Sequence, residues 1–258
     1  MAYRHQDLLV ELDGARLHAH RLLGGCAGTI VFLHDSLGAV STWREFPLRL
    51  CQSAGLDGLL YDREGYGRSS PLAGNRKTDY SSREAGVLAG LLQKLGIESA
   101  LLFGHSDGAT IALLTAALHP ALIRGVISEA GHVFNELITR EGVRAAKASY
   151  DADEKLRARL VRHHGGNAAK VLEIWAGDWL SEDFKAWNIE QFLPRIKCPV
   201  LVMQGENDDF GTLAQVEAIC KGIGKKAEPC IIPRAGHTPH REVEDVVLEK
   251  AAAFIARL

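Results

Sequence analysis

Short apolar runs alternate with longer amphipathic stretches along most of the chain. Two early segments, 7–13 and 15–22, flank Asp13-Gly14, a favoured pair for a two-residue hairpin turn. Beyond them, each apolar run is followed by a stretch with helical spacing of its apolar positions, in the order 29–34 and 41–53, 58–61 and 81–95, 100–104 and 107–118. This alternation predicts a mostly parallel sheet with helices on both faces.

Three further strand-like runs lie in the second half of the sequence, at 125–129, 199–204 and 227–232. An amphipathic helix is predicted over 242–258, at the end of the chain. Together with the hairpin and the earlier apolar runs, these segments make a central sheet of about eight strands. The predicted fold class is therefore α/β.

About seventy residues without a strand-like run separate the first two of these late strands. Helical patterns fill the interval, at 134–149, 153–164 and 168–178. A structureless loop of this length would be exceptional within a compact domain. We therefore predict a helical cap over 131–190, inserted into a core formed by 1–130 and 191–258.

The charge balance excludes some classes of partner. Thirty Lys and Arg residues and thirty-two Asp and Glu residues give a formal net charge of −2, and no long run of one sign occurs. Nucleic-acid binding needs a clustered basic surface, so no nucleic-acid partner is expected. Charges at Arg4, Asp7 and Glu11 interrupt the segment where a signal peptide needs an apolar core. With no apolar run near ~18 residues, a cytoplasmic protein without a membrane partner is expected.

The five cysteines are widely spaced and never form a C-x-x-C arrangement, which predicts reduced and mostly buried thiols. None of them has the neighbours of a reactive nucleophile. Neither a metal nor a cofactor is predicted, and the expected partner is a small-molecule substrate. The oligomeric state is left open.

Gly104-His105-Ser106-Asp107-Gly108 matches the pattern G-x-S-x-G and lies between an apolar run and a predicted helix. This context is that of a nucleophile elbow, a strained strand-to-helix turn that exposes a serine hydroxyl above the sheet. The helix start supplies free N–H groups for a developing oxyanion. We predict Ser106 as a nucleophile and interpret Asp107 as a first-turn acid whose backbone N–H does the chemical work.

With this elbow, the chain resembles the serine-nucleophile branch of the α/β-hydrolase superfamily that carries a helical cap, and the resemblance covers almost all of it. His34-Asp35-Ser36-Leu37-Gly38 stands where relatives often carry H-G-x-x-G, and 61–69 is similar to their D-x-R-G-x-G-x-S turn. The segments 205–208 and 236–237 follow late strands in the family's order of serine, acid and histidine. The resemblance implies the α/β-hydrolase fold.

The resemblance also implies His237 as the base, because the loop between the last strand and the closing helix carries it in the family. Histidine suits proton transfer since its pKa is near neutrality. His240 is the second candidate, although a position at a helix entry or cavity rim explains it better. His105 is expected to pack beneath the elbow.

A carboxylate must orient the base and stabilise its protonated form. Asp208 follows a late strand at the offset that the family favours, so the resemblance implies Asp208 as the acid. Two rival acids stay open. Asp209 directly follows it, and Glu129 ends the preceding strand, from which some relatives take their acid.

By the same resemblance, the oxyanion is bound by the backbone N–H groups of Asp107 and Ser36. Asp35 departs from the family, in which glycine is common at this position. The Ser36 hydroxyl would contact substrate or cap a turn. We assign Asp62 and Arg63 to a structural turn network.

Four residues of the cap region are candidates for substrate binding: His132, Arg140, Trp175 and Trp179. Aromatic walls would suit an apolar or aromatic acyl group, although two tryptophans four residues apart also suit packing of the cap on the body. Arg140 and Arg144 have the same spacing and would receive a carboxylate or lie on a solvated helix face.

The function that we expect is hydrolysis of a small-molecule ester, thioester or lactone through an acyl-serine intermediate. Cleavage of a carbon–carbon bond in a vinylogous diketone uses the same triad, and Arg140 or Arg144 near the serine would favour it. Two further classes are a non-catalytic ligand-binding protein with this fold and a cofactor-free lyase or oxygenase. Epoxide hydrolysis and dehalogenation are disfavoured, because similar proteins that perform them carry Asp at the elbow.

Overall fold

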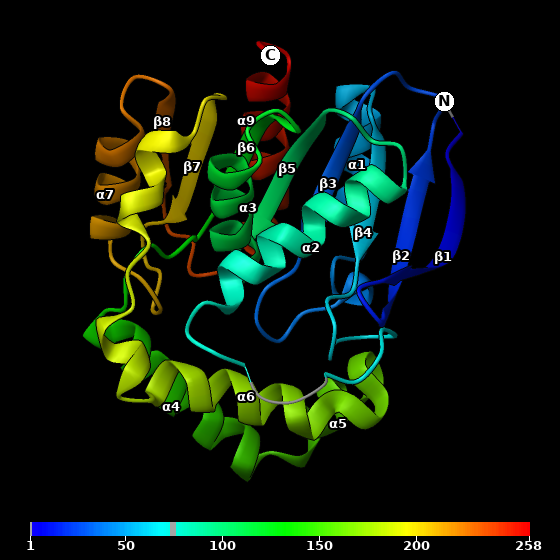
Figure 1. Cartoon of the computed structure of the whole chain (residues 1–258). Helices are drawn as coiled ribbons and strands as arrows, with labels where there is room; N and C mark the ends of the chain where they lie inside the picture. Colours follow the sequence, from blue (N-terminus) through cyan, green and yellow to red (C-terminus); the bar gives the residue numbers. More distant parts are fainter. Residues whose placement is uncertain (1, 73–75) are drawn as a thin grey trace.

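The computed structural model describes residues 2–72 and 76–258, and a single eight-stranded sheet runs through it (Figure 1). The strands are β1 (Arg4–Leu12), β2 (Ala15–Leu23), β3 (Thr29–Leu33), β4 (Asp57–Tyr61), β5 (Ala100–His105), β6 (Ile123–Glu129), β7 (Val200–Gly205) and β8 (Ala227–Ile232). Their order in the sheet is β1-β2-β4-β3-β5-β6-β7-β8. The pairs β1–β2 and β2–β4 are antiparallel, and all others are parallel. The predicted mostly parallel α/β sheet is confirmed.

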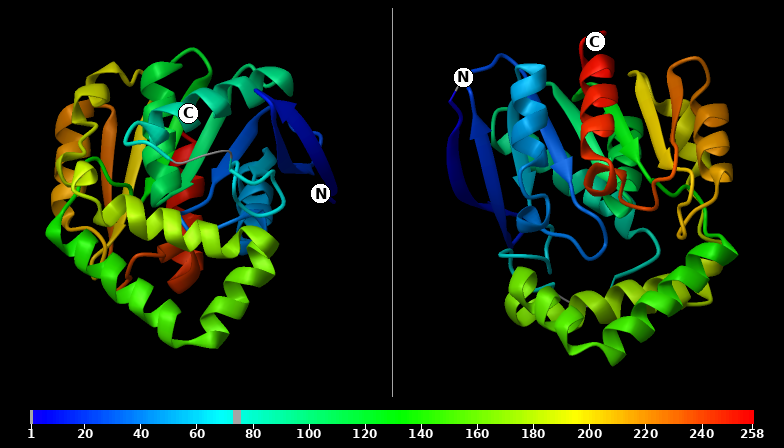
Figure 2. Two further views of the ribbon diagram at one scale, coloured as in Figure 1. Left: turned by 60° about the horizontal axis from the view of Figure 1, so that its bottom comes forward. Right: turned by 180° about the vertical axis from the view of Figure 1, so that it is seen from behind.

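Helices cover both faces of this sheet (Figures 1 and 2). One face carries α1 (Phe46–Ala54) and α9 (Glu244–Ile255), which pack against each other. The other face carries α2 (Tyr80–Lys94), α3 (Asp107–Leu118) and α7 (Leu213–Ile223). The remaining helices are η1 (Val40–Thr42), α4 (Leu137–Ala152), α5 (Glu154–His164), η2 (Gly165–Asn167), α6 (Ala168–Leu180), η3 (Asp183–Ala186), η4 (Glu190–Arg195) and α8 (Pro239–Glu242).

The strands divide the apolar side chains between two cores, one on each face. In β5, Leu102 belongs to the core beneath α2 and α3, whereas Leu101 and Phe103 belong to the core beneath α1 and α9. In β7, Val202 belongs to the core beneath α2 and α3, and Met203 belongs to the core beneath α1 and α9. Successive side chains of a strand point to opposite faces, so a strand buried on both faces is a continuous apolar run. This explains why the central strands could be predicted from short apolar segments.

Several predicted helix boundaries are wrong. The stretch 41–53 is not one helix, because Arg44 adopts a left-handed φ of 55° and a new helix begins at Phe46, with Pro47 in its first turn. The helix predicted over 242–258 is divided into α8 and α9 at Val243, whose φ of −141° and ψ of 52° lie outside the helical region. The helix predicted from residue 134 begins at Leu137, since Phe134 forms a β-bridge with Asn188. Helix α7 was not predicted.

The sheet has a topological switch point between β3 and β5. The chain leaves β3 through α1 and returns in β4, on one side. It leaves β5 through α3 and returns in β6, on the other side. Because the two connections diverge, the carboxyl ends of β3 and β5 border a crevice, which is where open α/β sheets bind ligands.

Helices α4, α5 and α6 follow β6 in the sequence and lie together at one end of the sheet (Figures 1 and 2). They contact one another, and α6 also contacts η3. The segment 137–180 that they form lies within the predicted cap, 131–190. In the part of the chain that the structure describes, no helix has the length and apolar character needed to cross a bilayer.

Two glycines allow helix α3 to approach the sheet closely. A Cβ atom at Gly108 would lie 2.1 Å from the carbonyl oxygen of Leu33 and 2.7 Å from that of His34. A Cβ atom at Gly104 would lie 2.3 Å from the carbonyl oxygen of Gly108. Backbone atoms occupy both positions, so no side chain fits there without moving β3 or α3.

Replacement of Gly108 with alanine is therefore expected to lower the free energy of unfolding by about 3 kcal/mol. Gly86 in α2 provides a matched control, because a Cβ atom at this position would have no atom within 4 Å. Gly86→Ala should raise the free energy of unfolding by about 0.5–1 kcal/mol. Urea denaturation measures both values. A Gly108→Ala protein as stable as the wild type would contradict the close approach.

Candidate active site

Ser106 occupies the turn between β5 and α3 in a strained backbone conformation. Its φ is 54° and its ψ is −117°, a combination that residues with a Cβ atom seldom adopt. The turn is held on both sides. The Ser106 N–H donates to the Glu129 carbonyl at 2.8 Å, and the Ser106 carbonyl accepts from the Ala109 N–H at 2.9 Å. Strain of this kind persists where the surrounding structure enforces it, and it exposes the serine side chain.

The three residues predicted as a triad lie in hydrogen-bonding contact. His237 Nε2 is 3.0 Å from Ser106 Oγ. His237 Nδ1 is 2.8 Å from Asp208 Oδ1 and 3.0 Å from Oδ2. Asp208 Oδ1 also accepts from the Phe210 N–H at 2.8 Å, which fixes the carboxylate. The arrangement allows His237 to take a proton from Ser106 through Nε2 while Asp208 holds Nδ1–H.

The pKa values of the pair shift in opposite directions. Burial alone would raise the pKa of Asp208, but the hydrogen bond and charge of His237 outweigh it, so this pKa is below its ordinary value. Burial would lower the pKa of His237, but the hydrogen bond and charge of Asp208 raise it above 6.5. Asp208 therefore stays ionised and favours the protonated form of His237.

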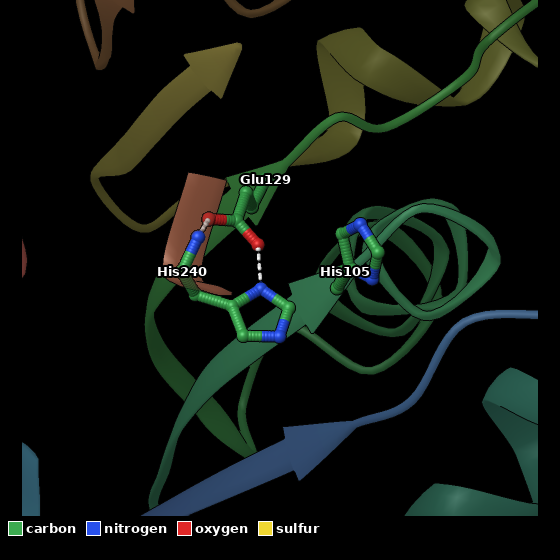
Figure 3. A group of neighbouring side chains, drawn as sticks. All are labelled: His105, Glu129 and His240. Carbon is green, nitrogen blue, oxygen red and sulfur yellow. Dashed lines mark hydrogen bonds and ion pairs between the residues drawn. The ribbon is translucent and has the colours of Figure 1, made fainter. Parts of the chain in front are cut away.

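Of the rival acids, Glu129 is engaged elsewhere (Figure 3). It accepts from the His240 backbone N–H at 2.9 Å, and its second oxygen is 2.5 Å from His240 Nδ1. His240 and Glu129 are both buried and paired with each other, whereas Asp208 is the carboxylate paired with His237. Asp209 is exposed, and its charge acts on His237 only as the weakest of the causes that shift its pKa.

His105 packs beneath the elbow, as expected. Its Nε2 is 2.8 Å from the His237 carbonyl oxygen and must donate, since a carbonyl can only accept. Among the described residues, His105, Glu129 and His240 form a group whose side chains are of the types that bind metals. Their possible ligand atoms lie within 4.8 Å of one another. Both oxygens of Glu129 already accept hydrogen bonds from His240. Hydrogen bonds within the protein thus explain this cluster, and they hold the loop of His237.

A buried guanidinium group orients the loop after β3. Arg63 donates to the His34 carbonyl at 2.6 Å and to the Asp35 carbonyl at 2.9 Å. The C=O and N–H groups of a trans peptide point in opposite directions, so the Ser36 N–H points away from Arg63. Ser36 itself lines the cavity that contains Ser106. The Asp62–Arg63 turn therefore has the structural role that the sequence suggested.

Arg63 also connects this loop to the elbow. It donates to Asp107 Oδ2 at 3.0 Å, and both side chains are 1 % exposed. Tyr80 donates to the other oxygen of Asp107. The Asp107 side chain is thus neutralised and turned into the body. Its backbone N–H is the first of helix α3, and the first N–H groups of a helix have no partner within the helix.

A cavity of about 530 Å³ lies in front of Ser106 and His237. Residues after β3, β5, β7 and β8 form one side of it, and α4 and α6 form the other. It therefore lies at the switch point, between the sheet and the helices of segment 137–180. Its polar groups include Asp35, Asp209 and Glu242, and no Lys or Arg is among the described residues that line it.

Three of the four predicted substrate-binding residues line this cavity: His132, Trp175 and Trp179. Arg140 does not. Its guanidinium donates to the Leu180 and Ser181 carbonyls, at the end of α6, at 3.3 Å each. Arg144 is exposed, and the cavity lining does not include it. The sequence spacing of the two arginines indicated a helix face but not the neighbouring helix end that binds Arg140.

The stripe of α4 that faces the cavity was not predicted. Thr139, Val143, Ala146 and Tyr150 line the cavity at helical spacing, and Phe210 lines it beside the predicted acid. The spacing is visible in the sequence, but it does not distinguish a face turned to a cavity from one that packs on the body. Phe210 also connects α4 with the predicted acid, because its N–H donates to Asp208 Oδ1 while its carbonyl oxygen is 2.6 Å from Thr139 Oγ1 and 3.0 Å from His132 Nε2.

Residues 30–250 match the model of the alpha/beta hydrolase family. The chain belongs to this family. The α/β-hydrolase is 27% identical to the serine hydrolase BPHL of Mus musculus over 243 residues, which are 92% of this chain and 81% of the relative. It is 28% identical over 226 residues to a 2-hydroxy-6-oxononadienedioate/2-hydroxy-6-oxononatrienedioate hydrolase of Pseudomonas putida, covering 78% of this chain and 77% of the relative.

Solved structures agree with this fold. The enol-lactonase of Burkholderia xenovorans LB400 superimposes with a TM-score of 0.77 at 22% identity, over 96% of this chain and 100% of that one. The predicted α/β-hydrolase fold is confirmed, and the chain is an α/β-hydrolase enzyme. A non-catalytic ligand-binding protein is not supported.

The strain at the elbow gives a measurable effect on stability. Ser106→Gly and Ser106→Ala both remove the hydroxyl and its hydrogen bond to His237, but only glycine relieves the positive φ. The free energy of unfolding of Ser106→Gly should therefore exceed that of Ser106→Ala by about 1 kcal/mol. Chemical denaturation compares them. If the glycine variant were equally or less stable, the turn would not be strained.

Proposed function

We propose that this α/β-hydrolase cleaves a small-molecule ester, thioester or lactone through an acyl-serine intermediate. The observation that carries the proposal is the continuous hydrogen-bonded series from Ser106 through His237 to Asp208, at the wall of a cavity. A serine hydroxyl becomes nucleophilic when an adjacent base accepts its proton. The mouse relative is named a serine hydrolase, which supports the same class of reaction.

In the proposed reaction, Ser106 attacks the substrate carbonyl carbon while His237 takes the hydroxyl proton. The carbonyl oxygen becomes an oxyanion that the Ser36 and Asp107 backbone N–H groups stabilise. His237 then gives the proton to the leaving group, and water hydrolyses the acyl-serine by the same route. Arg63 supports the proposal, because it fixes the peptide of Ser36 and the side chain of Asp107 at once.

The cavity supports an acyl group with an apolar or aromatic part. Trp175, Trp179 and Phe210 contribute large apolar surfaces to its wall, and burial of such groups favours binding. Carbon–carbon cleavage of a vinylogous diketone would have been favoured by Arg140 or Arg144 near the serine. Arg140 binds a helix end and Arg144 is exposed, so ester-type hydrolysis is the function that we propose.

A fluorophosphonate probe tests the nucleophile directly. The native protein should be labelled at one site, and Ser106→Ala should not be labelled, because only a serine activated by a base reacts at neutral pH. Ser99→Ala is the matched control, since Ser99 is exposed and outside the cavity lining. Labelling should be detected by intact mass. Labelling of Ser106→Ala at the wild-type rate would overturn the proposal, as would an unlabelled native protein.

The acid can be identified from a pH profile. His237 must be neutral to act as a base, so kcat/KM should rise with pH through the pKa of His237, which Asp208 holds above 6.5. Asp208→Asn removes the largest cause that raises this pKa, so the midpoint should move to lower pH and kcat should fall on the order of 10³–10⁴-fold.

Asp209→Asn is the matched control for this experiment. It removes an adjacent but exposed carboxylate, so the midpoint should stay near that of the wild type and kcat should fall only a few-fold. A larger loss in Asp209→Asn than in Asp208→Asn would assign the acid to Asp209 instead.

A further inference from the structure

A second cavity, of about 300 Å³, adjoins the catalytic cavity. The two share Asp35, Leu37 and Tyr150 in their walls. The second is lined by Arg44, Arg159, Arg162 and Arg241, and we refer to it as the arginine cavity. Nothing in the proposed reaction uses these four residues.

The arginines come from three separate parts of the chain. Arg159 and Arg162 lie three residues apart on α5, below the side of the sheet that carries β3 and β4 (Figure 1). Arg44 follows η1, and Arg241 is on α8. The tertiary fold, not a run of basic sequence, gathers these charges at the junction of the cap helices with the body.

The arginine cavity carries more positive than negative charge in its wall. None of the four guanidinium groups forms an ion pair with any residue in 2–72 or 76–258, and Arg241 donates instead to the Thr42 carbonyl at 3.0 Å. Asp35 is the one carboxylate among the described lining residues. All four arginines are exposed, so water screens their mutual repulsion and their guanidinium donors stay accessible to an anion.

His163 completes the wall as a neutral group. Burial lowers its pKa, and the nearby positive charges of Arg159, Arg162 and Arg241 lower it further. Its Nδ1 is 2.8 Å from the Ser41 hydroxyl oxygen. His163 and Ser41 therefore offer neutral hydrogen-bonding groups, while the arginines supply the charge.

We propose that the arginine cavity binds a phosphate group carried by the substrate while the reacting carbonyl lies at Ser106. A guanidinium group presents its donors in a planar fork that matches phosphate or carboxylate oxygens. Four arginines against one carboxylate favour a dianion, and a phosphate monoester is close to doubly charged at neutral pH. The two cavities adjoin at Asp35, Leu37 and Tyr150, so the proposed substrate extends past these residues. The substrate class is then a small phosphorylated ester or thioester.

Direct binding is the first test, and it does not depend on the proposed reaction. Calorimetry at about 0.15 M NaCl should detect saturable binding of inorganic phosphate and pyrophosphate to the wild type and to Ser106→Ala alike. Arg159→Gln/Arg162→Gln should bind each at least about tenfold more weakly, because charge-assisted hydrogen bonds are lost. Succinate tests whether a dicarboxylate can replace phosphate. It should bind to the wild type at least about tenfold more weakly than pyrophosphate.

The control removes the same charge elsewhere. Arg195 and Arg257 are exposed and do not line the arginine cavity, so Arg195→Gln/Arg257→Gln should bind phosphate like the wild type. Circular dichroism and thermal unfolding should verify that each variant is folded. Equal losses in the two double variants would overturn the proposal, because the attraction would then belong to the whole molecule. Absent saturable binding, or tighter binding of succinate, would overturn it as well.

The second test is kinetic and rests on the proposed function. The acetyl ester of 2-hydroxyethyl phosphate and that of 2-methoxyethanol differ in the phosphate group, so the ratio of their kcat/KM values measures its recognition. This ratio should fall about tenfold or more in Arg159→Gln/Arg162→Gln and be unchanged in the control. An unchanged ratio in both would overturn the placement of substrate phosphate. If the wild type bound phosphate but hydrolysed neither acetyl ester, the result would instead contradict the proposed function.

Discussion

The close contact between the start of α3 and the end of β3 is the constraint on which the site depends. Gly108 brings the helix backbone against the Leu33 carbonyl, and Gly104 lets the strand turn directly beneath it. A larger residue at either position would separate Ser106 from the loop after β3. Because the two elements touch through their backbones, the serine and the Ser36 peptide are placed by main-chain geometry and not by flexible side chains.

The Arg63–Asp107 pair adds an electrostatic constraint to this steric one. Transfer of both charges into the interior costs several kcal/mol per ion, and their attraction offsets that cost only when the geometry is good. Here the terminal nitrogens of Arg63 also donate to two carbonyl oxygens, while its buried Nε–H has no partner, and Tyr80 donates to the other oxygen of Asp107. We therefore interpret the Arg63–Asp107 pair as a device that orients the loop after β3, and not as a large contribution to the free energy of unfolding. It fixes the directions of two peptides that no hydrophobic contact could orient.

The sequence was sufficient where local chemistry decides the structure. The doubly buried strands, the span of α3 and the elbow follow from apolar runs and from glycines around Ser106. The position of Arg140 could not be predicted, because its partners lie about forty residues away at the end of another helix. The division of the last helix at Val243 and the gathering of four arginines around one cavity could not be predicted for the same reason. Both depend on how distant segments pack, which no spacing along the chain encodes.

Phe210 connects helix α4 with the predicted acid, Asp208. Its N–H holds the Asp208 carboxylate, while its carbonyl accepts from Thr139 at the start of α4. Phe210 thus forms hydrogen bonds both with Asp208 and with α4, the helix that lines the other side of the cavity. A displacement of α4 would act through Phe210 on Asp208, the carboxylate that contacts His237. The position of α4 and the orientation of the Asp208 carboxylate are therefore not independent of each other.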